Sequence, residues 1–292
     1  MGINSFPGYK PGDIIDLSRF EKEKREKEIT RDKNLESYLP FLNDSMQKIA
    51  ENNNHDFPGF LDSDNRIAIS GYDEEIDKKI VEKDELKFSL KENKTLANWQ
   101  IDKEKDSSNL TEISITILLH KVLGNDFIVA RSSAYDDYRN GVDQVIIYKP
   151  TGEVVCGIDE VILRTGDADS VVKSEKLQKV MLAGGANVKY GAKLNRVVSK
   201  VAEKKYEFIE KGGLVRSEVE HVPAFYMALS KLELGELLEN LKNNPNKTSE
   251  FELAIFRKLL NSLELQFSRQ KLSDDLKIKT ESMLTKFRQS LG

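Results

Sequence analysis

The chain has 292 residues, of which 39% are hydrophobic and 32% charged, and its formal net charge is −4. This composition is typical of a globular protein, and the mild negative charge argues against a protein that coats nucleic acid through bulk electrostatics. The single cysteine, Cys156, excludes a disulfide scaffold and a multi-cysteine zinc site. Transmembrane-length apolar runs and a signal-peptide pattern are both lacking, so we expect a cytoplasmic protein without a membrane partner.

Residues 1–100 show little regular apolar periodicity. Proline and glycine crowd residues 1–15, which predicts an irregular arm. A stretch rich in Lys and Glu follows, in which Ser18 and Glu21 have the spacing of a capping box, and it predicts a solvated helix. The stretch 51–66 is rich in Asn and Asp and predicts a loop. We therefore expect a mostly helical or irregular N-terminal extension over residues 1–100.

A buried helix and a strand are predicted next. The helix follows the capping residues that begin at Ser107, carries an apolar stripe and ends at Gly124. Glu112 lies near the N-terminus of this helix, beside the apolar stripe. The helix dipole stabilises a carboxylate at this position, so the sequence is equally compatible with a structural role and with a role in a site. The apolar run Phe127–Ala130 is typical of a short strand.

A β-hairpin is predicted around Pro150 and Gly152, which suit a type I turn followed by a bulge. A three-residue loop would pair Lys149 with Glu153. Both faces of this hairpin are largely apolar, so we expect it to lie centrally in a sheet that is covered on both sides.

The same register places Asp143 opposite Asp159 on one face of the hairpin. Glu160 then points to the other face and would contribute its backbone carbonyl, whereas a register slip of one residue exchanges Asp159 for Glu160. Two carboxylates at the end of an apolar face repel each other unless a cation or a proton lies between them. The sequence therefore predicts a divalent metal site with oxygen ligands from Asp143, Asp159 and Glu160.

The chain becomes basic after the hairpin. Residues 164–216 contain twelve Lys or Arg against six Asp or Glu, which indicates a surface that could face nucleic-acid phosphates. A second helix, two strands and a third helix are predicted within or just after this segment, completing a core domain over residues 101–243. Two capped helices over residues 244–292 should pack as an antiparallel pair, or form a homo-oligomer.

The order of helix, three strands and helix, with Glu112 in the helix, Asp143 at the second strand and an acidic residue in the third, resembles the PD-(D/E)XK nuclease superfamily. The resemblance covers about 75 residues from Ser107 to Leu182. It implies an α/β (α+β) fold with a central mixed sheet flanked by helices, that is, a restriction-endonuclease-like core. It also implies a phosphodiesterase or nuclease that acts on nucleic acid with Mg²⁺ or Mn²⁺.

Carried over to this sequence, the resemblance gives metal roles to Glu112, Asp143 and Asp159. The family's catalytic lysine falls on Val161, which cannot stabilise hydroxide or developing negative charge. Some members of the superfamily take the basic group from the following helix, so the expected catalytic residues also include lysines of that helix, namely Lys173, Lys176 or Lys179.

Two other classes stay open. A nuclease-like module that has lost catalysis and binds nucleic acid or a protein is favoured by Val161 and by the long helical flanks. The other class is a structural or assembly protein, in which the terminal helices mediate oligomerisation. The acidic residues would then only cap the ends of strands.

Overall fold

The computed structural model describes residues 35–68, 74–163, 175, 178–194, 197–200, 207–210, 214–269 and 272–291. The helix expected from Ser18 and the two lysines Lys173 and Lys176 lie outside the described residues.

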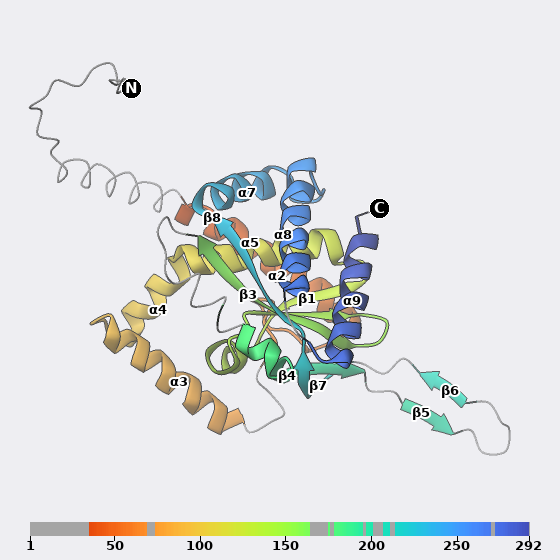
Figure 1. The fold of residues 1–292 in the computed structure, drawn as a ribbon. Coiled ribbons are helices and arrows are strands. Elements are labelled where there is room, and N and C mark those ends of the chain that lie inside the picture. The colour runs from red at the N-terminus through yellow and green to blue at the C-terminus, as the bar shows by residue number, and fades with distance from the viewer. Residues whose placement is uncertain are drawn as a thin grey trace, which may run out of the picture.

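A four-stranded mixed sheet lies at the centre of the protein, in the order β1-β2-β3-β8 (Figure 1). Strands β1 (Phe127–Arg131), β2 (Gln144–Tyr148) and β3 (Glu153–Leu163) pair antiparallel, and β8 (Ala224–Ser230) pairs parallel with β3. Their side chains are almost all buried, because elements cover both faces of the sheet. The predicted α/β class with a central mixed sheet is confirmed.

The hairpin turn differs in detail from the prediction. Tyr148, not Lys149, pairs with Glu153, so the loop is one residue longer than expected. Gly152 has a φ of 66° and donates its N–H to the carbonyl of Tyr148 at 2.7 Å, which is the left-handed conformation that favours glycine here.

A bulge between Ile146 and Ile147 then shifts the register by one residue. The predicted alignment is restored at the far end of the hairpin, where Gln144 pairs with Ile158 and Asp143 donates its N–H to the carbonyl of Ile158 at 2.9 Å. Asp143 lies just beyond this last pair, so its predicted pairing with Asp159 stays a prediction.

Helices cover one face of the sheet. Helix α5 (Ser107–Leu123) is buried along most of its length and packs against β1 and β3. Helices α2 (Leu39–Asp56), α7 (Lys231–Asn243) and α8 (Glu250–Ser268) pack around α5 (Figure 1). The predicted capping box at the start of α8 is confirmed. α9 (Asp274–Gln289) packs against α8 and β3.

A second, two-stranded sheet packs against β3. It consists of β4 (Ala186–Leu194) and β7 (Leu214–Val222), which pair antiparallel. β5 (Val197–Lys200) and β6 (Glu207–Glu210) form a separate pair that Figure 1 shows away from the central sheet.

The region before α5 is more helical than expected. The predicted loop over residues 51–66 is wrong in its first part, because α2 continues to Asp56. Helices α3 (Glu74–Lys91) and α4 (Leu96–Lys105) follow, and a short π-helix, η1 (Asp136–Asn140), lies between β1 and β2. In the described part of the chain, none of the helices combines the length and the apolar character needed to cross a membrane.

Candidate functional site

Four carboxylates gather where β2 begins and β3 passes α5. Glu112 belongs to α5, Asp143 directly precedes β2, and Asp159 and Glu160 are consecutive residues of β3. The main-chain N–H of Glu160 donates to Oδ2 of Asp143 at 2.9 Å. The negative charges of Asp143, Glu112 and Asp159 all act on Glu160. We call these four residues the acidic cluster.

The structure shows which face of the hairpin meets α5. Gln144 pairs with Ile158, and its side-chain Nε2 donates to the carbonyl of Glu112 at 2.9 Å, so this face of the hairpin lies against α5. Side chains alternate along a strand, so Glu160 shares this face and Asp159 points to the other. Glu160, expected to contribute only its backbone, is therefore the strand carboxylate on the face of Glu112.

Burial gives Glu160 unusual protonation chemistry. Its side chain is 2% exposed. Burial, followed by the charges of Asp143, Glu112 and Asp159, raises its pKa well above the ordinary glutamate value. Such a group favours the neutral form unless a cation balances the charge. A divalent cation beside Asp143 and Glu160 would supply that balance.

Gln144 provides a further oxygen on the same face. Its Nε2 also donates to Oγ1 of Thr116 at 2.6 Å, which fixes the amide. Its Oε1 is buried and accepts no hydrogen bond from the described part of the chain. Gln144 and Glu160 are diagonal neighbours across the β2–β3 pair, within reach of long side chains. Carboxylate and amide oxygens are ligands that Mg²⁺ and Mn²⁺ accept.

The donor set therefore fits a hard cation held by Asp143 and Glu160, with Gln144 as a candidate third oxygen. Among the residues that the structure describes, no three His, Cys, Asp or Glu side chains are grouped to hold a metal ion by themselves. A cation here would accordingly need the Gln144 amide or water to complete its coordination.

Glu112 is engaged by two arginines. Nε of Arg131 donates to Oε1 of Glu112 at 2.6 Å, and Nη2 of Arg66 lies 3.6 Å from the same oxygen. Burial acts to raise the pKa of Glu112, but the charges of Arg131 and Arg66 outweigh it and the pKa is lowered. Glu112 is therefore an ionised carboxylate held by arginines, which competes with the metal role expected from the sequence.

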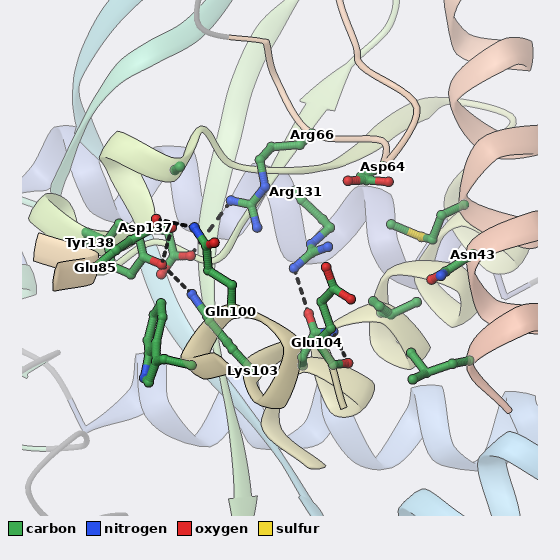
Figure 2. Close-up of a pocket in the computed structure, with 16 residues that line it drawn as sticks. Asn43, Asp64, Arg66, Glu85, Gln100, Lys103, Glu104, Arg131, Asp137 and Tyr138 are labelled. Carbon is green, nitrogen blue, oxygen red and sulfur yellow. Dashed lines mark hydrogen bonds and ion pairs between the residues drawn. The ribbon is translucent and has the colours of Figure 1, made fainter. Parts of the chain in front are cut away.

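A polar pocket of about 440 Å³ opens beside this arginine pair. Figure 2 shows Arg66 and Arg131 next to each other in the pocket, with Lys103 and Asp137 further along. Asp137 lies 3.7 Å from Nη1 of Arg66. The pocket thus adjoins the acidic cluster, and Glu112 links the two.

The basic group of the resembled family is lacking at the expected position. Val161 is 6% exposed and pairs with Ala228 of β8, so it belongs to the core. Lys173 and Lys176 lie outside the described residues, and Lys179 is exposed.

Sequence reasoning missed Arg66, Lys103 and Arg131. Each lies in a polar stretch without a motif, and the first two come from segments expected to be a loop or left unassigned. The run of polar residues that follows β1 was the only available signal, because it marks a loop at a strand end where sites often form.

The chain matches no family model, no curated protein and no solved structure, so no relative supplies a function for it.

Proposed function

We propose that this protein is a metal-dependent phosphodiesterase that acts on nucleic acid, with a core similar to that of the PD-(D/E)XK nucleases. The observation that carries the proposal is the hydrogen bond from the main-chain N–H of Glu160 to the carboxylate of Asp143. The two acidic residues lie at the junction of two central strands, and Glu160 is buried facing the helix that carries Glu112.

The order of elements supports the proposal. Helix α5 leads into the antiparallel strands β1, β2 and β3, and the chain then passes a helical stretch before β8 joins in parallel. A restriction-endonuclease-like core is expected to have a central sheet of this kind, with both antiparallel and parallel strands.

Asp143 and Glu160 would hold Mg²⁺ or Mn²⁺, with Asp159 adding negative charge from the opposite face. When bound, the ion would polarise a phosphodiester and lower the pKa of an attacking water. The carboxylate of Asp143 accepts from the main-chain N–H of Glu160 and so holds the backbone of β3 in place. The side chain of Gln144 donates to the carbonyl of Glu112 and so holds α5 against β2. Lys173 and Lys176 are the proposed basic groups that stabilise negative charge during cleavage. Residues 164–216 are the proposed surface that contacts nucleic acid.

A module that binds nucleic acid without cleaving it is the second candidate. The buried Val161 and the ion pair between Glu112 and Arg131 favour it, because they remove a basic group and one metal ligand from the expected set.

Cleavage assays separate the two candidates. Supercoiled plasmid, single-stranded DNA and RNA would be incubated with the protein in Mg²⁺, Mn²⁺ or EDTA. The nuclease proposal expects metal-dependent cleavage that falls at least about a hundredfold in Asp143→Asn and Glu160→Gln. Glu153→Gln is the matched control, because Glu153 is exposed in the same strand. Binding without turnover in every metal would support the second candidate.

A further inference from the structure

The main chain holds Arg66 and Arg131 side by side, although they are far apart in the sequence. The N–H of Ile67 donates to the carbonyl of Arg131 at 3.0 Å, and the N–H of Arg131 donates to the carbonyl of Asn65 at 2.9 Å. Asn65 is fully buried and its Nδ2 donates to the carbonyl of Val129 at 2.8 Å. Both arginines are therefore positioned by a fixed backbone bridge between the loop and the end of β1.

The two guanidinium groups converge on one carboxylate oxygen. Oε1 of Glu112 lies 2.6 Å from Nε of Arg131 and 3.6 Å from Nη2 of Arg66. Nη2 of Arg131 also donates to Oδ1 of Asn109 at 2.9 Å. Planar guanidinium groups arranged around a single oxyanion form the geometry that recognises carboxylates and phosphates. Glu112 thus occupies a position that a phosphate oxygen could take.

Lys103 supplies a third cation to the same pocket. Its Nζ donates to the hydroxyl of Tyr138 at 2.7 Å and lies 4.4 Å from the centre of that ring. Figure 2 shows Lys103 entering the pocket from α4, at a distance from the Arg131 side. The volume of about 440 Å³ leaves room for a phosphate and an attached sugar.

Four carboxylates also line the pocket, namely Asp64, Glu85, Glu104 and Asp137. Glu85 accepts hydrogen bonds from Tyr138 at 3.1 Å and from Gln100 at 2.9 Å. Asp137 pairs with Arg66, and burial raises its pKa, with a further contribution from Glu112. Lys103 and Arg131 nevertheless have more N–H groups than their hydrogen bonds use, because Lys103 donates to Tyr138, and Arg131 donates to Glu112 and Asn109.

We propose that this pocket binds a backbone phosphate of the nucleic-acid substrate through Arg66, Lys103 and Arg131, and that this phosphate displaces the Glu112 carboxylate from the arginine pair. The inference rests on the proposed function for the identity of the substrate. It assigns to the arginine pair the stabilisation of phosphate charge that Val161 cannot provide.

Binding of a labelled single-stranded DNA, followed by fluorescence anisotropy in EDTA, tests the pocket without metal-dependent cleavage. We expect Arg66→Lys, Arg131→Lys and Lys103→Gln each to weaken binding about tenfold, because lysine cannot reproduce bidentate contacts and glutamine lacks the charge. Arg288→Gln is the matched control, since Arg288 is exposed and pairs with Glu264 on the C-terminal helices. It should bind within about twofold of wild type.

Glu112→Gln gives a result in the opposite direction. Removal of the competing carboxylate should tighten DNA binding several-fold, whereas a purely structural ion pair predicts no gain. The double substitution Glu112→Gln with Arg131→Gln keeps the test informative if Arg131→Lys fails to fold, because it removes both partners of the buried pair. This double variant should bind as weakly as Arg66→Lys.

The outcomes distinguish this inference from the proposed function. Weaker binding by the three pocket variants, without cleavage in any metal, would support the pocket and reject the nuclease. Metal-dependent cleavage together with unchanged DNA affinity in Lys103→Gln and Arg66→Lys would overturn the pocket and leave the nuclease. Failure of the wild-type protein to bind the DNA would also overturn the pocket.

Discussion

The main-chain N–H of Glu160 donates a 2.9 Å hydrogen bond to the side-chain Oδ2 of Asp143. This contact joins the start of β2 to the middle of β3 and brings two acidic residues together in the core of the sheet. The fold must therefore accommodate Glu160 either as a neutral acid or beside a cation.

Glu160→Gln should stabilise the metal-free protein. The folded-state pKa of Glu160 is raised above 4.5, so the unfolded chain ionises first as the pH increases, and the folded state loses stability until its own pKa is reached. At neutral pH in EDTA we expect Glu160→Gln to raise the free energy of unfolding by about 1–3 kcal/mol. Urea denaturation from pH 4 upward would measure this gain, which should shrink toward the acidic end. A loss of stability at neutral pH would contradict the assignment.

Gln144→Met should weaken metal binding. The buried Oε1 of Gln144 is a candidate ligand or support for the ion, so its removal should lower the affinity for Mn²⁺ about tenfold. Thr116→Val is the control, because it removes a hydrogen-bond partner of Gln144 without changing Oε1. Calorimetric titration with Mn²⁺ would compare the two, and equal affinities would remove Gln144 from the site.

Lys121→Met should be strongly destabilising. Nζ of Lys121 lies 2.6 Å from Oε1 of Glu252, which is fully buried at the start of α8. Loss of the lysine leaves a buried carboxylate without its cation, at a cost of about 3–5 kcal/mol. Adding Glu252→Gln should recover a large part of this loss. Denaturant unfolding of the single and double variants would measure the coupling free energy between Lys121 and Glu252. Additive effects of the two substitutions would argue against a stabilising ion pair.

Asp136→Asn should loosen β4 from η1. Oδ1 of Asp136 accepts from the N–H of Lys189 at 2.8 Å, and Oδ2 accepts from the N–H of Tyr190 at 3.0 Å. An asparagine presents an NH₂ group to one of these donors, which should cost about 2–3 kcal/mol. Amide hydrogen exchange should show the loss in β4. Asp44→Asn, which changes an exposed carboxylate, should leave that exchange unchanged.

The hairpin could be predicted because turn chemistry and side-chain alternation are local. Pro150 and Gly152 lie in the turn, and the predicted alignment returns beyond an unforeseen bulge, where Gln144 pairs with Ile158. Which face of the hairpin meets α5 could not be predicted, since alternation says which residues share a face and not what covers that face. The sequence therefore left open whether Glu160 contributes its side chain or only its backbone carbonyl.

The arginine pair could not be predicted for a different reason. Arg66 and Arg131 meet through a backbone bridge between a loop and a strand end. Nothing local to either residue indicates a long-range contact of this kind, whereas the capping box at Ser249 was recognisable within four residues.

The central claim is that Asp143 and Glu160 hold a divalent cation. Anomalous diffraction from crystals soaked in Mn²⁺ tests it most directly. The expected result is a manganese peak at about 2.1–2.4 Å from a carboxylate oxygen of each residue, lost in Glu160→Gln. A soaked crystal without manganese between these two residues, or with the peak unchanged in Glu160→Gln, would contradict the claim.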